Sequence, residues 1–289
     1  MEDPAALRFH WRLPTLREAP DLETHLAICR QAEEYGIESV LLPLDHTDPD
    51  PFVWAATLGR RTDRIRFLIG IRSGLSSPTY WTQQVNTLAV VVQGRLAIHV
   101  VTEYQPAEQL RYGDAIGRDG WYRRTDEFWQ ICLGLWRGNE PVTLAGNHYT
   151  IDGAKINARF TSGNGRRRPE IYLDGDHATA ADLAIRHADC LLTRATGPDH
   201  LADHVRPVLD AGVEVGLVTT MPAWVGRKPG SAADFAEAIV AYREAGVTQF
   251  LLSGGPSRPS LDWLRCFGQD VLPRVREREG SLALPDRGR

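Results

Sequence analysis

The sequence lacks the features that define several large classes of protein. No stretch approaches the ~20 consecutive apolar residues that a transmembrane helix requires. The N-terminal MEDPAALRFHW is acidic and contains no hydrophobic signal core, so we expect a cytoplasmic protein. The formal net charge of −4 gives no overall attraction to polyanions, and we predict that the partners include neither nucleic acid nor membrane.

Cysteine is scarce, and the usual catalytic motifs are absent. The four cysteines are far apart in the sequence and match no zinc spacing, which indicates reduced, buried thiols. The histidines have no ligand-type spacing either, so we expect no metal site. The chain contains no Gly-x-Ser-x-Gly elbow, Walker loop or dinucleotide-binding fingerprint.

What the sequence does contain is a regular alternation of strand-like and helix-like segments. The expected strands span residues 7–13, 39–44, 65–71, 96–101, 170–173, 190–193, 213–219 and 249–252. The expected helices span residues 22–35, 52–60, 80–92, 122–136, 178–186, 200–211, 232–245 and 260–275. Eight such units predict an α/β fold, a closed (β/α)8 TIM barrel forming one domain over residues 1–289, with an open doubly wound sheet as the alternative.

One segment interrupts this alternation. Residues 141–156 carry alternating β-type residues around Gly146-Asn147, which predicts a hairpin inserted between the fourth helix and the fifth strand. Residues 157–168 then form a polar loop. We interpret its basic run, Arg166-Arg167-Arg168, as a solvated loop, with a phosphate or nucleic-acid contact as the alternative.

Polar side chains follow the expected strands at the end of the barrel where TIM-barrel sites lie. The candidates are His46 and Asp48, Ser73 and Gly74, Thr102, the turn of Asp174, Gly175, Asp176 and His177, then Arg194. Their hydroxyl groups and glycines suit a phosphate or a polyol. In the stretch IYLDGDHATAADLA, the turn and Thr179 open a helix whose free N–H groups could bind an anion, although its carboxylates could equally be ordinary N-caps.

Several stretches together resemble the bacterial luciferase-like flavin monooxygenases, closest to the alkanesulfonate monooxygenase branch. They are HWRLPT, AEEYGIESVLLPL, RIRFLIGIRSGLSSPTYWTQQVNTL, GRLAIHVVT, RTDEFWQICLGLWRG, HYTIDGAKI and AGVTQFLLSGGP. The resemblance implies a barrel that binds reduced FMN, supplied by a separate flavin reductase, and uses oxygen to oxidise an organic substrate. It also implies a homodimer.

The resemblance implies specific flavin contacts. Ser73-Gly74 falls where the family often has a non-prolyl cis peptide beside the flavin ring. Thr102 and Tyr122 fall where a threonine meets the flavin and a tyrosine approaches its phosphate. Gly175, Asp176, His177 and Thr179 match the phosphate-binding junction, with His177 expected to neutralise Asp176.

The departures from the family pattern argue against a desulfonating enzyme. Val218 and Thr220 stand where the sulfonate branch has a catalytic arginine and histidine, and the helical insertion after residues 213–219 is truncated. Asp48 replaces a cysteine and Arg194 an aromatic residue. We therefore regard His46, Asp48 and Arg194 as candidates for substrate contact or proton transfer.

Three functions follow. The first is an FMN-dependent monooxygenase acting on a specialised small-molecule or carrier-bound substrate, in secondary metabolism. The second is a non-catalytic barrel that serves as a partner subunit or binding protein. The third is a deazaflavin-dependent oxidoreductase. Binding of reduced FMN separates the first from the second, and hydride transfer without oxygen identifies the third.

Overall fold

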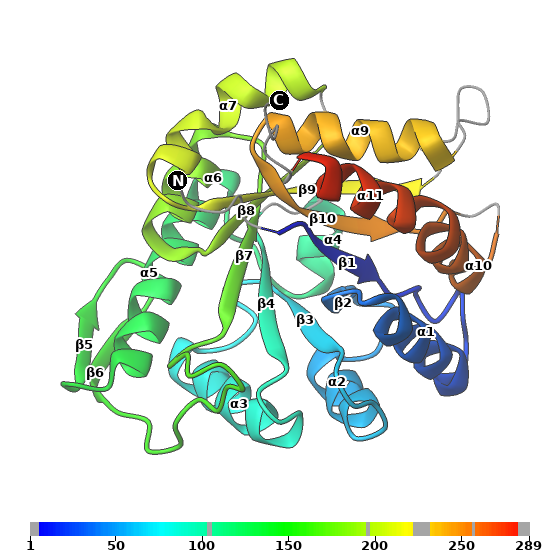
Figure 1. Cartoon of the computed structure of the whole chain (residues 1–289). Coiled ribbons are helices and arrows are strands. Elements are labelled where there is room, and N and C mark those ends of the chain that lie inside the picture. Colours follow the sequence, from blue (N-terminus) through cyan, green and yellow to red (C-terminus); the bar gives the residue numbers. More distant parts are fainter. Residues whose placement is uncertain (1–5, 103–105, 195–196, 222–231, 256–257, 283–289) are drawn as a thin grey trace.

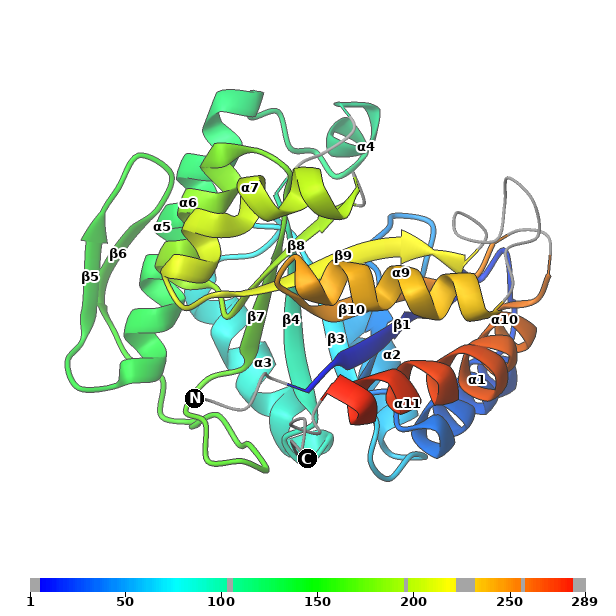
Figure 2. The same ribbon diagram turned by 45° about the horizontal axis from the view of Figure 1, so that its top comes forward.

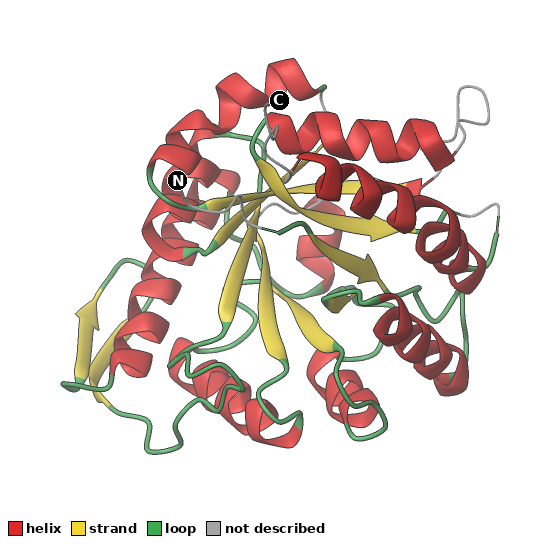
Figure 3. Cartoon of the chain, in the orientation of Figure 1, coloured by secondary structure: helices red, strands yellow, loops and turns green. Residues whose placement is uncertain are grey.

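A closed barrel of eight parallel strands forms the centre of the molecule (Figures 1 and 3). The computed structural model describes residues 6–102, 106–194, 197–221, 232–255 and 258–282. The strand order around the barrel is β1-β10-β9-β8-β7-β4-β3-β2. The strands are β1 Arg8–Arg12, β2 Ser39–Leu42, β3 Arg66–Ile71, β4 Leu96–Val101, β7 Glu170–Asp174, β8 Cys190–Arg194, β9 Glu214–Thr220 and β10 Val247–Ser253. The predicted TIM barrel is confirmed.

Helices cover the outside of the barrel, and each predicted helix is present (Figure 3). They are α1 Leu22–Tyr35, α2 Pro51–Gly59, α3 Pro78–Val91, α4 Pro106–Arg111, α5 Arg118–Arg137, α6 Ala178–His187, α7 Pro198–Asp210, α9 Ala232–Glu244, α10 Ser260–Cys266 and α11 Leu272–Leu282. Two details were not predicted. The short α4 precedes α5, and a π-helical segment, Phe267–Val271, joins α10 to α11.

The predicted insertion is a two-stranded hairpin, β5 Val142–Ala145 and β6 Thr150–Ala154, which stands beside α5 outside the barrel (Figure 2). One carboxylate holds it there. Glu127 of α5 accepts hydrogen bonds from the backbone N–H groups of residues 147, 148 and 149 at 2.8–3.0 Å. These bonds give the backbone N–H groups of the turn an acceptor. Burial alone would raise the pKa of Glu127, but the bonds lower it.

Two apolar layers account for most of the packing. The larger lies between the strands and the surrounding helices, and Trp11, Phe67 and Phe250 are among its fully buried side chains. The smaller fills the barrel interior with Leu41, Leu68, Ala97, Tyr172, Cys190, Leu192 and Leu251. The barrel is therefore a packed core rather than a pore. All four cysteines are free thiols; Cys29, Cys132 and Cys190 are buried as expected, whereas Cys266 is half-buried.

An ionic cluster closes the barrel at the end where the strands begin. We call this group the basal layer; it consists of Arg8, Glu38, Arg66, Glu170 and Glu214. Glu170 accepts from Arg8 at 2.6 Å and from Arg66 at 2.9 Å. These arginines hold the pKa of Glu170 at about 2, although burial alone would raise it.

None of the helices in the described ranges is long and apolar enough to cross a membrane.

Candidate active site

The opposite end of the barrel, where the strands finish, carries the residues that the sequence singles out; we call it the rim. Residues 103–105, 195–196, 222–231 and 256–257, which follow β4, β8, β9 and β10, lie outside the described residues. The expected truncation falls on one of these ranges, between the end of β9 and Ala232 of α9. The geometry of the rim therefore comes mainly from β2, β3, β4, β7 and α5.

The first turns of α5 contact the end of β3. The Ser73 hydroxyl lies 2.7 Å from that of Thr125, and both side chains are buried. Gly74 has φ +99°, and a side chain there would overlap the guanidinium of Arg124. Only glycine fits this approach without strain. The described residues contain no cis peptide bond, so the cis Ser73-Gly74 peptide of the family pattern is not found.

The same helix reaches the turn after β7. A side chain at Gly175 would overlap Ala180 of α6, and it would lie 3.9 Å from the Tyr122 hydroxyl oxygen. Thr102, at the end of β4, donates to the carbonyl of Asp174 at 3.1 Å. Ser73, Gly74, Thr102, Tyr122 and Gly175 therefore form one connected arc across β3, β4 and β7.

Asp176 is neutralised in a way that the sequence did not predict. Its carboxylate accepts from the Thr193 hydroxyl at 2.6 Å, and from the backbone N–H and the guanidinium of Arg194 at 2.9 Å each. Burial alone would raise the pKa of Asp176, but these partners hold it below its usual value. The cation that we expected to be His177 is thus Arg194, because Asp176 turns toward β8.

The first turn of α6 remains accessible beside this ion pair. His177 is the N-cap residue and makes no side-chain capping bond, and both His177 and Thr179 are exposed. A helix start without a capping side chain offers backbone N–H groups and the positive end of the helix dipole. With Asp176 already paired, this turn fits a phosphate group.

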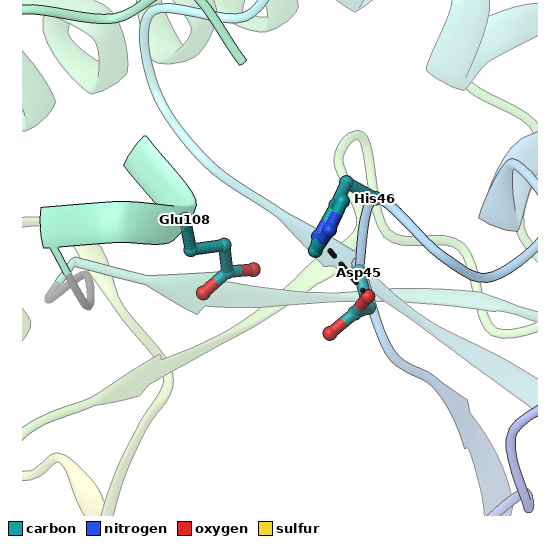
Figure 4. A group of neighbouring side chains, drawn as sticks. All are labelled: Asp45, His46 and Glu108. Carbon is teal, nitrogen blue, oxygen red and sulfur yellow. Dashed lines mark ion pairs between the residues drawn. The ribbon is translucent and has the colours of Figure 1, made fainter. Parts of the chain in front are cut away.

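His46 and Asp48 lie on another part of the rim, after β2. Figure 4 shows His46 between Asp45 and Glu108 of α4. Their ligand-type atoms all lie within 4.8 Å of one another, a proximity that the sequence spacing does not reveal. However, Glu108 accepts from Arg72 at 2.6 Å, and the Arg111 guanidinium lies 3.2 Å from His46 Nε2. Two cations therefore already occupy this group, which makes it a poor site for a metal ion.

Asp48 has a positional role in this segment. Its carboxylate accepts from the backbone N–H of Leu16 at 3.0 Å and so fastens the segment after β2 to the one after β1. The three predicted catalytic residues are not brought together: His46 and Asp48 lie after β2, whereas Arg194 ends β8 and pairs with Asp176, which follows β7.

The sequence reasoning missed His99. This residue lies in β4 and is 6% exposed, with Nε2 3.8 Å from a carboxylate oxygen of Asp174. Burial lowers the pKa of His99 to about 4, so the ring is neutral at physiological pH. The signal was present, since His99 is the one polar residue in the apolar strand LAIHVV.

Comparisons with known proteins agree with this fold. A family model described as luciferase-like monooxygenase matches residues 7–243. EDTA monooxygenase from Chelativorans sp. BNC1 superposes with a TM-score of 0.78 at 16% identity, covering 94% of each chain. The FMN complex of the oxygenating constituent of 3,6-diketocamphane monooxygenase from Pseudomonas putida superposes with a TM-score of 0.71 at 16% identity, covering 93% of this chain and 99% of that one. An F420-dependent secondary alcohol dehydrogenase superposes with a TM-score of 0.74 at 19% identity, covering 94% of this chain and 99% of that one.

Proposed function

Because the chain belongs to the family of luciferase-like monooxygenases, we propose that it is an FMN-dependent monooxygenase that receives reduced flavin from a separate reductase. The observation that carries this proposal is the arc. Of the residues chosen as flavin contacts, Ser73 and Gly74 meet α5 through Thr125 and Arg124, and Gly175 approaches Tyr122 of the same helix. Thr102 joins them through its bond to the carbonyl of Asp174.

The arc and the α6 turn would hold the two ends of FMN. The phosphate would take backbone N–H groups at the start of α6, with the Tyr122 hydroxyl and Gly175 beside it. Ser73, Gly74 and Thr102 would lie along the ring. When bound, reduced FMN supplies the electrons that activate oxygen.

The remaining residues would support that site. Arg194 keeps Asp176 from repelling the phosphate. His99, neutral and 3.8 Å from Asp174, would hold or pass a proton inside the mouth of the barrel. His46, exposed at the rim, would contact the substrate, while Asp48 positions its segment. The substrate is a small or carrier-bound organic molecule of secondary metabolism.

A second candidate is a deazaflavin-dependent oxidoreductase. The fold likeness to the F420-dependent secondary alcohol dehydrogenase favours it, because the same barrel accommodates that cofactor. It would transfer hydride without consuming oxygen. A non-catalytic barrel, the further alternative, would bind neither cofactor at this site.

Anaerobic titration separates these candidates. The purified protein is titrated with reduced FMN and with reduced F420, and absorbance and fluorescence report binding. Micromolar binding of reduced FMN, followed by oxygen consumption when a flavin reductase is added, supports the monooxygenase. Preference for F420 supports the second candidate, and a folded protein that binds neither cofactor excludes both.

We also propose a homodimer, with α2 and α3 as the contacting helices. Val53 of α2 and Tyr80 and Val90 of α3 are large apolar residues that are 57–65% exposed. Exposed apolar side chains on neighbouring helices suit a symmetric interface. Analytical ultracentrifugation of the wild type and of Tyr80→Glu tests this arrangement, with the variant expected to be monomeric.

A further inference from the structure

A hollow of about 500 Å³ lies at the basal end of the molecule, far from the rim. It lies between the last turn of α5, the last turn of α6 and the segment that leads into β7 (labelled in Figure 2). Its charged lining residues are Arg137, Arg166, Arg167, Arg168, Arg186 and His187. None of its lining residues is acidic, whereas the chain as a whole has a net charge of −4. This contrast is the first indication of an anion site.

The nearby carboxylates are too few to neutralise these arginines. A single carboxylate, that of Asp189, serves two of them: it accepts from Arg166 at 2.6 Å and from Arg168 at 2.6 and 3.0 Å. In the described part of the chain, no carboxylate lies within 4.0 Å of Arg137 or Arg167, and both side chains are exposed. The hollow therefore has an excess of positive charge.

His187 lies beside these arginines on the lining of the hollow. Its side chain is 8% exposed, and Nε2 lies 2.5 Å from Asp126, which Arg186 also contacts. Its other ring nitrogen, Nδ1, is buried with no hydrogen-bond partner in the described ranges. Because Nε2 faces a carboxylate, Nδ1 can donate to an anion only when the ring is protonated, so a bound anion would favour the charged form of His187.

A second hollow adjoins the first and enlarges the space. It measures about 760 Å³ and shares Trp136, Arg137, Asn139, Arg166 and Arg167 with the first. It adds Lys155 and Arg159 together with the apolar Phe160, and one acid, Glu140. An anionic group in the first hollow could thus continue into an organic part in the second.

We propose that these two hollows bind a small phosphate-bearing molecule, with the phosphoryl group among Arg137, Arg167 and His187. Guanidinium groups match phosphate oxygens in charge and geometry. The concave shape and the buried histidine favour a compact group over the extended backbone of a nucleic acid. The site is separate from the flavin site and does not depend on the proposed function.

Calorimetric titration with inorganic pyrophosphate at low ionic strength tests this inference. Saturable pyrophosphate binding that depends on Arg137 and Arg167 is expected, separate from any pyrophosphate held at the α6 turn. The double variant Arg137→Ala/Arg167→Ala should weaken it by about tenfold or more, because two charged donors are lost. The matched control, Arg30→Ala/Arg206→Ala, removes two exposed arginines from α1 and α7 and should bind like the wild type.

Two further measurements keep the outcomes apart. The ring signals of His187 in NMR spectra should shift at the same pyrophosphate concentration, which would place the binding in this hollow. Reduced FMN should bind the Arg137/Arg167 double variant as it binds the wild type. Absence of saturable binding, equal loss in both double variants, or binding of a DNA duplex without any response to pyrophosphate would overturn the proposal.

Discussion

His10 and His99 lie inside the same barrel, and burial lowers the pKa of both to about 4, yet their surroundings differ. At the basal end, His10 is held at both ring nitrogens, by the Ser39 hydroxyl at 2.7 Å and by the Gln249 side chain at 2.8 Å. Toward the rim, His99 Nε2 has no hydrogen-bond partner in the described ranges and lies 3.8 Å from Asp174.

The difference separates polar groups that stabilise the fold from polar groups that are available to bind or react. His10 and the charged groups of the basal layer bond one another, so they hold the strands together. At the rim, a neutral histidine and an accessible helix start keep hydrogen-bonding capacity for another molecule. This division matches the general behaviour of TIM barrels, in which stability belongs to one end and chemistry to the other.

The strongest test of the basal end is Glu170→Gln, which removes the most buried carboxylate of the layer while Arg8 keeps Glu214 and Arg66 keeps Glu38. We expect the free energy of unfolding to fall by about 1.5–3 kcal/mol, because two charged hydrogen bonds are lost. Urea denaturation measures this loss. Glu237→Gln, exposed on α9, is the control and should cost less than about 0.5 kcal/mol. A loss this small for Glu170→Gln would contradict a structural role for the basal layer.

Acidification tests both histidines at once. The unfolded chain binds protons at these residues below about pH 6.5, whereas the folded protein resists protonation until about pH 4. Stability should therefore fall between these values, by about 1.4 kcal/mol per pH unit for each histidine. His99→Gln should remove one histidine's contribution to the slope of stability against pH. His204, exposed on α7, is the control, and His204→Gln should leave the slope unchanged. Denaturation at several pH values gives the slopes, and an unchanged slope in His99→Gln would count against a neutral His99.

At the rim, Arg194→Ala should weaken FMN binding about fivefold, on the order of 1 kcal/mol, because Asp176 stays charged but loses its cation beside the phosphate. The Arg194 side chain is 67% exposed, so stability should hardly change. Asp176→Asn is the matched variant: it removes the repelling charge and should bind FMN at least as tightly as the wild type. Equal affinities for Arg194→Ala and wild type would place the phosphate elsewhere.

The smallest effect belongs to His46→Gln. The residue is exposed and touches only neighbouring rim residues, so the free energy of unfolding should change by less than about 0.5 kcal/mol. Steady-state kinetics should show a higher KM with little change in kcat, as expected for a substrate contact. A large loss of kcat would instead make His46 the proton-transfer group, in preference to His99.

The architecture could be predicted from the sequence because hydrophobic periodicity and the residues that begin and end helices are local features of the chain. Asp21 caps α1 through the N–H of Thr24, and Gly36 ends it at φ +74°, both visible as residue types in the chain. The hairpin was likewise predicted from alternation around Gly146-Asn147. The helix α4 was missed because its six residues are too few to show a periodic pattern.

The site was harder to predict because its contacts are not local. Nothing near Asp176 in sequence indicates that its carboxylate turns to Arg194, 18 residues later, instead of toward His177. His99 was overlooked because attention fell on residues after the strands, whereas its side chain projects from within one. The Asp45–His46–Glu108 group joins residues from two elements, so no spacing rule could find it.

The contacts of α5 also have an evolutionary consequence. Its first two turns meet β3 through Thr125 and Arg124 and approach the β7 turn through Tyr122, so a substitution at one position disturbs fits at several places. Among homologues, these positions should change together or not at all. The hairpin on the outer side of the same helix is fastened by Glu127 and by the ring of Tyr149, which packs against Phe128, so the rest of the hairpin should be free to vary in composition. One helix would thus carry a constrained face toward the barrel and a more permissive face outside it.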